Sequence, residues 1–268
     1  MAVQQRLLEK IAEKNVVTSD EMSDIARSIL NQDTEKSYIY RKFVYPLLKK
    51  GYLQRIRRNL YHVTPPGKKN SQADRFLVAS RLKEDYYIGF HAVLEFYGKA
   101  YSYYNNVHIC VKPRNRFTRF TYDNVTYTPY LTEDTVTQTT THLYRGEPVR
   151  VCTKERLYLE CVKHPDNAGG WEETLKSLGS LGGIDFDTLI DYTIQQDTQA
   201  LLRRIGLTLE LFQRESVFYQ HIDEEKIKKL SSRVKGNNQY LVRGTRGTLN
   251  EKWRLYVPND FTEYLRGI

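Results

Sequence analysis

Hydrophobic positions in the first fifty residues recur with the period of an α-helix. They fall three and four residues apart in 3–14, in 18–30 and in 34–50, so each stretch is predicted to form a helix with one apolar face. Thr18 stands three residues before Glu21, which is the spacing of a capping box and marks the start of the second helix. The chain is therefore predicted to begin with three short helices.

The third helix is followed by a predicted β-hairpin. Pro46 should kink or split this helix, because proline lacks a backbone donor and crowds the preceding turn, and Gly51 should end it. Two runs of strand-forming residues follow at 52–56 and 60–63, joined at 57–59. Three helices and a two-stranded hairpin, in this order, are typical of a winged helix-turn-helix.

Residues 64–71 break both periodicities with stiff prolines and polar side chains, which predicts an interdomain linker. We expect a winged helix-turn-helix domain at 1–66 and a larger second domain at 67–268. The second domain should combine a small antiparallel sheet with a helical part at 154–234 and strand-like runs at 239–258. The fold class is predicted to be α+β. The strands expected in the sheet are 107–111, 125–130 and 149–152.

Composition is typical of a folded, soluble protein. Of 268 residues, 40% are hydrophobic and 12% are aromatic, and the mean hydropathy is −0.61. No uncharged apolar run approaches the ~20 residues of a membrane helix, and the N-terminus lacks a signal-peptide core, so we expect a cytoplasmic protein. The cysteines have no C-x-x-C spacing and are predicted to be buried free thiols. They are Cys110, Cys152 and Cys161.

Charge singles out the third helix and the hairpin. The protein has 41 basic and 32 acidic residues, and residues 36–73 contain ten of the basic ones and no acidic one. Removing those ten leaves 31 basic residues against 32 acidic ones, so the basic character belongs to this one stretch. A surface that is merely soluble mixes both signs to limit self-repulsion. We therefore expect this module to bind double-stranded DNA.

The polar positions of the module divide by role. Residues on the exposed side of the third helix are candidates for contacts with base edges, and those in and behind the hairpin for contacts with phosphates. The base-edge candidates are Ser37, Tyr38, Arg41 and Lys42, and Lys36 is a further DNA-binding candidate on the same helix. The phosphate candidates are Lys49, Lys50, Arg55, Arg57, Arg58 and Asn59.

Two further basic clusters are candidates for a second anionic contact. Four cations alternate with Phe117 and Phe120, and the alternative is a charged loop beside an edge strand. These cations are Lys112, Arg114, Arg116 and Arg119. Arg203 and Arg204 lie on a predicted helix, and they either pair with acidic residues such as Asp197 and Glu210 or bind an anion.

No catalytic signature is apparent. The chain lacks the motifs of metalloproteases, P-loop enzymes, α/β-hydrolases and dinucleotide-binding proteins, and its six histidines are scattered. Gly179-Ser180 precedes Asp185 and Asp187 by too few residues for the metal site of a nucleotidyltransferase, and a helix cap explains the acidic pair. We expect no catalytic residue, no metal and no cofactor.

Four segments together resemble the AbiE-type (type IV) antitoxin family. The likeness is carried by residues 50–61 in the predicted hairpin, 87–94, 151–160 with Pro165 and Gly169-Gly170 after it, and 200–210. The chain departs from the family pattern at three positions. Asn59 and Phe90 stand where glycine is expected, and Glu160 stands where aspartate is expected. Asparagine tolerates a left-handed turn, so the hairpin should survive the first change.

The resemblance implies a two-domain bacterial or archaeal antitoxin with a role in phage defence. Its winged helix would bind inverted repeats upstream of its own operon and repress transcription. Its second domain would counter a nucleotidyltransferase-like toxin without forming a stable complex with it. Two other interpretations stay open: a winged-helix regulator whose second domain senses a small molecule, and a nucleic-acid-processing enzyme.

Overall fold

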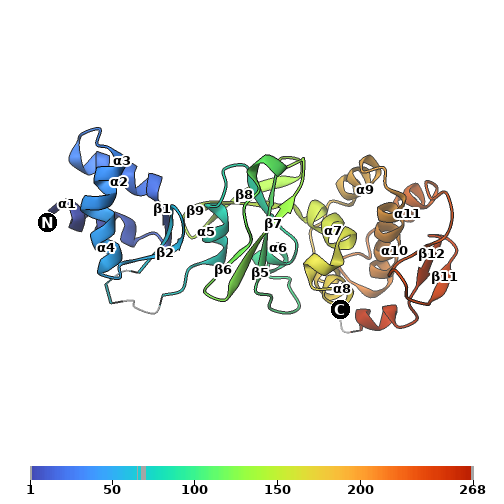
Figure 1. Cartoon of the computed structure of the whole chain (residues 1–268). Helices are drawn as coiled ribbons and strands as arrows, with labels where there is room; N and C mark the ends of the chain where they lie inside the picture. Colours follow the sequence, from blue (N-terminus) through green and yellow to red (C-terminus); the bar gives the residue numbers. More distant parts are fainter. Residues whose placement is uncertain (1, 65, 68–70, 267–268) are drawn as a thin grey trace.

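The computed structural model describes residues 2–64, 66–67 and 71–266 as an elongated molecule (Figure 1). The elements follow one another along its long axis in chain order, from N-terminal helices through a central sheet to a mainly helical C-terminal part. Helices and several sheets are combined, which confirms the α+β class. The predicted linker at 64–71 lies partly outside the described residues. None of the described helices is both long and apolar enough to cross a membrane.

The first two helices begin where the sequence predicts. Helix α1 (Ala2–Ala12) is followed by a short strand, β1 (Val16–Thr18), and by helix α2 (Ser19–Leu30). The Thr18 side chain accepts a hydrogen bond from the Glu21 backbone N–H, and the Glu21 carboxylate accepts one from the Thr18 N–H at 2.6 Å. This reciprocal pair is the predicted capping box.

The third helical segment is interrupted beside its proline. Helix α3 (Lys36–Ile39) continues into a π-helical turn (Tyr40–Val44) and then into helix α4 (Tyr45–Lys49). The Tyr45 N–H donates to the carbonyl of Tyr40, five residues back. Because Pro46 cannot donate to the preceding turn, the widened turn accommodates it. Gly51 ends the segment with a φ of +75°.

The hairpin forms a three-stranded sheet with β1, in the order β1-β3-β2. Strands β2 (Leu53–Arg57) and β3 (Leu60–Val63) are antiparallel, and Asn59 between them has a φ of +64°. Asparagine therefore makes the left-handed turn that was expected of it. Strand β1 was not predicted, because an alternation of apolar and polar residues cannot be recognised over three positions.

The apolar faces of the N-terminal elements form their own cluster, which includes Leu7, Ile11, Phe43 and Leu47. The opposite face of the N-terminal sheet belongs to the larger core of the protein. Val16, Ile56 and Leu60 pack into that larger cluster, so the hairpin is held against the central part of the molecule.

The central sheet is larger than predicted. It has six strands in the order β6-β7-β5-β4-β9-β8, and it is mixed, because β5 pairs with β7 and β4 pairs with β9 in parallel. The expected small antiparallel sheet is therefore wrong. The strands are β4 (Tyr86–Gly89), β5 (Asn106–Val111), β6 (Phe120–Tyr122), β7 (Val125–Leu131), β8 (Thr139–Tyr144) and β9 (Glu147–Cys152).

Two short helices belong to the central part. Helix α5 (Arg75–Ser80) is capped by the Asp74 carboxylate, and α6 (His91–Phe96) follows β4 directly. Phe90, at the junction, is fully buried and has φ 58° and ψ −143°, a conformation normally left to glycine. A 3₁₀ helix (Pro113–Asn115) leads to β6.

The C-terminal part is helical with a small sheet at its end. Gly206 in helix α10 (Gln199–Glu215) packs against the Trp253 ring so closely that a Cβ there would lie 2.0 Å from it. The helices are α7 (Lys154–Lys163), α8 (Trp171–Gly179), α9 (Phe186–Gln195), α10 (Gln199–Glu215) and α11 (Glu224–Ser231), with 3₁₀ helices at Pro165–Ala168 and Phe261–Leu265. Strands β10 (Gln239–Tyr240), β11 (Thr248–Asn250) and β12 (Leu255–Val257) form a sheet in the order β10-β12-β11.

The three cysteines are buried and free, as predicted. Burial raises the pKa of each thiol well above its usual range.

Candidate nucleic-acid interface

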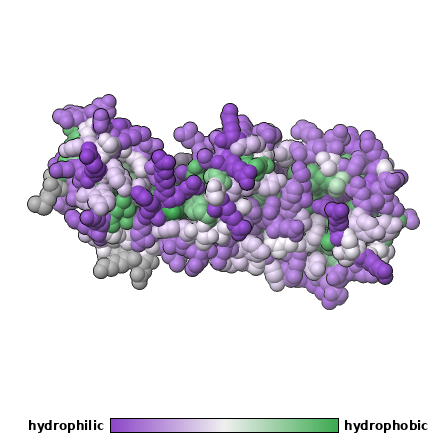
Figure 2. Space-filling view, in the orientation of Figure 1, coloured by the Kyte–Doolittle hydropathy of each residue, from purple (hydrophilic) through white to green (hydrophobic). Residues whose placement is uncertain are grey.

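The segment from α3 to α4 presents its polar positions to solvent. Ile39, Phe43 and Leu47 are buried in the N-terminal core. The predicted contacts Lys36, Ser37, Tyr38, Arg41, Lys42, Lys49 and Lys50 are all exposed. Figure 2 shows that the N-terminal part is largely hydrophilic on the face in view. The helical period thus separates core from surface as the sequence predicts.

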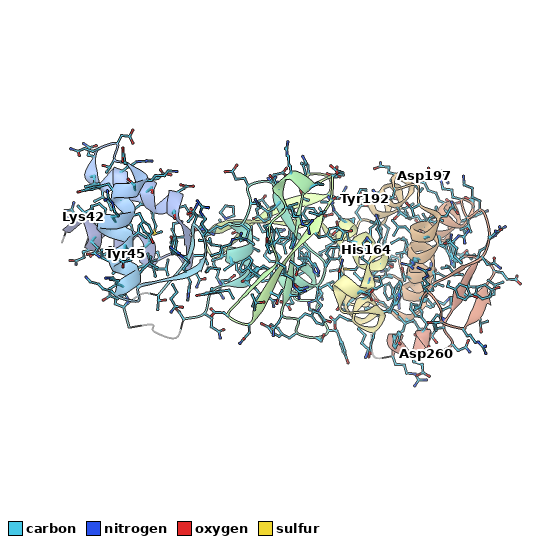
Figure 3. All side chains as sticks on the ribbon, viewed as in Figure 1. Lys42, Tyr45, His164, Tyr192, Asp197 and Asp260 are labelled. Carbon is cyan, nitrogen blue, oxygen red and sulfur yellow. The ribbon has the colours of Figure 1, made fainter. Side chains whose placement is uncertain are left out.

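Aromatic rings accompany the cations on this surface. Tyr38 and Tyr45 are 45% and 46% exposed, although tyrosine is usually half-buried. The Lys49 ammonium lies 5.0 Å from the centre of the Tyr45 ring. Tyr45 and Lys42 are labelled on the N-terminal helical segment in Figure 3. Cations mixed with exposed rings can contact both phosphates and bases.

Two of the predicted helix contacts already have acidic neighbours. Lys36 Nζ lies 2.5 Å from Asp20 Oδ1, and the Ser37 hydroxyl donates to Glu35 Oε2 at 3.2 Å. Both ends of the Lys36–Asp20 pair are exposed, so solvent screens the attraction and the pair is weak.

Within the part of the chain that the structure describes, the other cations of this surface have no acidic partner. No carboxylate of the described residues lies within 4.0 Å of the charged groups of Arg41, Lys42, Lys50 or Arg58. These side chains reach solvent with their charge uncompensated. An uncompensated cluster attracts polyanions at long range and releases counterions from them on binding.

The hairpin is tied to the helical segment by Arg55. Its Nη2 donates to the Tyr40 hydroxyl at 3.1 Å, and its guanidinium lies 5.9 Å from the centre of the Tyr61 ring. Hydrogen bonding to Tyr61 raises the pKa of Arg55 above its usual value. Helix and hairpin therefore form one surface.

Arg57 connects the hairpin to the second basic cluster. Its guanidinium lies 5.0 Å from the centre of the Phe120 ring and 5.7 Å from that of Phe117. The Tyr122 hydroxyl donates to Gln54 of β2 at 3.2 Å. Two segments that are about sixty residues apart in sequence thus lie side by side, which local patterns could not reveal.

The second cluster is an exposed loop anchored by one ring. Phe117 is buried, whereas Arg114, Arg116 and Arg119 are exposed. Lys112 differs from them, because it pairs with Asp85 at 3.4 Å.

Arg203 and Arg204 are placed quite differently. Arg203 is fully buried, and its guanidinium donates to the carbonyls of Asn237, Lys235 and Arg254. Arg204 donates to the carbonyls of Lys163 and Leu241. The anion contact considered for this pair is therefore wrong for Arg203, which solvent does not reach.

The acidic partners expected for the two arginines are also wrong. Glu210 accepts a hydrogen bond from Trp253 Nε1 at 2.7 Å and pairs with Lys252 at 3.0 Å. Main-chain carbonyls take the place of carboxylates as the acceptors for both guanidiniums.

The acidic pair near Gly179 serves the fold. The Asp185 carboxylate caps α9 by accepting from the N–H groups of Asp187 and Thr188, as predicted. Asp187 pairs with Lys226 at 2.7 Å. In the described parts of the chain, no group of three or more His, Cys, Asp or Glu side chains is placed to hold a metal ion.

Comparison with solved structures finds a similar fold. No family model and no curated protein matches the chain. The crystal structure of the RV2827C protein from Mycobacterium tuberculosis is similar to this structure with a TM-score of 0.66 and 11% sequence identity. The match covers 99% of this chain and 94% of that chain. The two proteins therefore share a fold over nearly their whole length.

Proposed function

We propose that this protein binds double-stranded DNA through α3–α4 and the β2–β3 hairpin, in the manner of a winged helix-turn-helix. The observation that carries the proposal is a set of exposed cations, on the α3–α4 segment and the hairpin that Arg55 joins to it, that have no carboxylate within 4.0 Å among the described residues. The segment from α3 to α4 would enter the major groove, with Tyr38, Arg41 and Lys42 facing base edges. The hairpin would lie along the adjacent backbone, with Arg58 and Asn59 at its tip.

The biological role proposed is that of an autorepressor and antitoxin in a type IV toxin–antitoxin system. Support comes from the family resemblance in residues 50–61, 87–94, 151–160 and 200–210. On this proposal the protein represses its own operon and counters a nucleotidyltransferase-like toxin without a stable complex. It has no catalytic activity of its own and acts without a metal or cofactor.

DNA titration tests the first half of the proposal. The protein is titrated against its own upstream DNA and against a scrambled duplex of equal length, at two salt concentrations. Preference for the native duplex that persists at the higher salt is expected of an operator-binding regulator. Equal, salt-labile binding to both duplexes would leave only generic affinity and would favour the interpretation as a nucleic-acid-processing enzyme.

Co-expression tests the second half. The gene next to that of the protein is induced alone and together with the protein, and cell growth is followed. Growth arrest that the protein relieves is expected. The variant Arg41→Ala, which should bind DNA poorly, separates the two activities, because relief that survives in this variant does not depend on repression. Absence of relief would leave a DNA-binding regulator whose second part has another role.

A further inference from the structure

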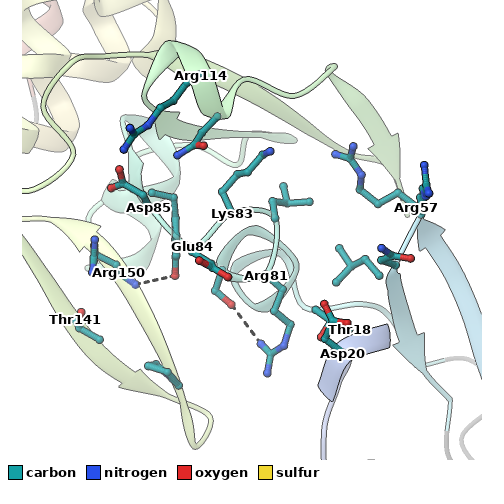
Figure 4. A pocket seen from close by; sticks show the side chains of 18 residues that line it. Thr18, Asp20, Arg57, Arg81, Lys83, Glu84, Asp85, Arg114, Thr141 and Arg150 are labelled. Carbon is teal, nitrogen blue, oxygen red and sulfur yellow. Dashed lines mark hydrogen bonds between the residues drawn. The ribbon is translucent and has the colours of Figure 1, made fainter. Parts of the chain in front are cut away.

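A large cleft lies beside the tip of the hairpin. It has a volume of about 1020 Å³ and is bounded by the β2–β3 turn, the segment between α5 and β4, the Pro113–Asn115 helix and strand β9 (Figure 4). Six cations from these elements line it. They are Arg57, Arg58, Arg81, Lys83, Arg114 and Arg150.

Arg81 is the one cation of the six that carboxylates of the described residues neutralise. Arg81 pairs with Glu147 at 3.0 Å and with Glu21 at 3.4 Å, and its side chain is nearly buried. For the other five, no carboxylate of the described residues lies within 4.0 Å. In Figure 4, Lys83 lies between Arg57 and Arg114.

The acidic residues of the cleft do not restore the balance. Asp20 is paired with Lys36, and Asp85 is paired with Lys112, and neither lysine lines the cleft. Glu84 is the third acidic residue of the lining. Five unpaired cations therefore face one unpaired carboxylate in a concave site, where low-dielectric walls concentrate the potential.

The cleft is continuous with the proposed DNA surface. The turn residues Arg57, Arg58 and Asn59 belong to both. Asp20 is a second connection between the cleft and the proposed DNA surface, because it lines the cleft and pairs with Lys36 at the start of α3. A polyanion bound at α3–α4 and the hairpin would therefore meet Lys83, Arg114 and Arg150 directly beyond the hairpin tip.

We propose that this cleft binds backbone phosphates of the same DNA duplex, so that the DNA interface extends from the N-terminal helices onto the central part of the protein. The proposal rests on the proposed function. A polymer with regularly spaced phosphates fits the observation that the free cations come from four separate elements. A single small anion could contact only some of them.

The test compares the parent protein with the variant Lys83→Gln/Arg114→Gln/Arg150→Gln. DNA affinity is measured over a series of salt concentrations, and the protected bases are mapped by hydroxyl-radical footprinting. A plot of log K against log salt has a negative slope, and each lost phosphate contact makes it less steep by about 0.9. The slope of the variant should therefore be less steep than that of the parent by roughly 2 to 3. Protection should shorten on the hairpin side, and sequence preference should stay unchanged.

Two controls isolate the site. The variant Lys228→Gln/Arg243→Gln/Arg246→Gln removes three charges, all of them exposed, from the C-terminal part and should keep the parent slope. The variant Lys83→Arg/Arg114→Lys/Arg150→Lys keeps the cleft charge and should also keep the slope. Thermal unfolding of each variant ensures that folded proteins are compared.

The outcomes separate this inference from the function it builds on. A parent protein that binds no DNA overturns both. A parent that binds its own DNA preferentially, with a cleft variant of the same slope and footprint, overturns the cleft alone. Inorganic pyrophosphate is titrated calorimetrically as a probe for a small-anion site. Binding of pyrophosphate that the cleft variant loses, with DNA binding unchanged, would also overturn the proposal.

Discussion

The arginines of the N-terminal surface and the arginines of α10 belong to the same residue type and have opposite surroundings. Arg41 is exposed and has no carboxylate within ion-pair distance in the described structure, whereas Arg203 is fully buried and hydrogen-bonded to three carbonyls. A guanidinium can therefore fasten a fold or remain available to a ligand. The burial and the hydrogen-bond acceptors around a cation, and not its charge alone, therefore decide its role.

The largest expected effect is on folding. Replacing Arg203 by methionine keeps much of the volume but removes three hydrogen bonds from the buried guanidinium to main-chain carbonyls, which should lower the free energy of unfolding by on the order of 3 kcal/mol. DNA affinity of the folded protein should not change. Urea unfolding and a DNA titration measure the two quantities, with Arg243→Met as the exposed control. An Arg203 variant that is as stable as the parent but binds DNA more weakly would show that Arg203 serves binding and not the fold.

Acid should destabilise the protein through a buried histidine. Burial lowers the pKa of His108 from 6.5 to about 4, and the charges of Arg119 and His91 act in the same direction. The unfolded chain therefore binds a proton at higher pH than the folded one. The stability contributed by neutral His108 is complete above pH 6.5 and is lost as the pH falls toward 4, by roughly 1–3 kcal/mol.

Urea unfolding of the parent and of His108→Gln at pH 7.5, 6 and 5 tests this. The parent should lose more stability than the variant over this range. His62 and His164, whose pKa values are also lowered by burial, should leave some acid sensitivity in both proteins. Parallel curves for the two proteins would show that His108 is protonated equally in the folded and unfolded states.

On the exposed surface the expected effects fall on binding. Arg41→Ala should weaken binding to the native duplex by about 1–3 kcal/mol and relax its sequence preference, because a contact with a base edge is lost. Thermal stability should stay within ~0.5 kcal/mol of the parent, since the side chain is exposed and unpaired. Fluorescence anisotropy on native and scrambled duplexes measures both effects. An equal loss of affinity for both duplexes would show that Arg41 contacts a phosphate and not a base edge.

The smallest expected effect belongs to Arg58. Arg58→Gln should weaken binding to all DNA uniformly and reduce the salt slope by about 1, because a phosphate contact carries no sequence information. Arg57→Gln should have the same effect on DNA and should in addition loosen the hairpin from Phe117 and Phe120. Limited proteolysis distinguishes the two variants. A change of sequence preference in Arg58→Gln would place this side chain at a base.

Local features of the fold were predictable, and long-range ones were not. The capping box at Thr18, the end of the third helix at Gly51 and the left-handed turn at Asn59 depend on neighbouring residues, so they could be predicted from the sequence. Strand β1 and the parallel pairing of β4 with β9 depend on partners that are distant in the chain. Short strands with such partners carry little local signal.

The candidate site shows the same division. The exposed cations of α3–α4 follow from helical periodicity and an acid-free stretch. Lys83 gave no signal because Glu84 and Asp85 follow it directly. Arg150 gave none because it is a single cation in a strand, and the cleft that they share is created by the packing of separate elements. The buried role of Arg203 was likewise hidden, since its carbonyl partners lie more than thirty residues away.

The π-helical turn at Tyr40–Val44 sets the phase of the proposed recognition segment. A turn with i to i+5 bonding holds more residues than an α-helical one, so positions after it are rotated about the helix axis relative to a continuous α-helix. Arg41 and Lys42 lie within the widened turn, and Lys49 lies after it. If the same residues formed an uninterrupted α-helix, every charge would stay in the sequence and Lys49 would still move by about 100° around the axis. Homologous chains with and without this turn would then read different DNA with the same side chains.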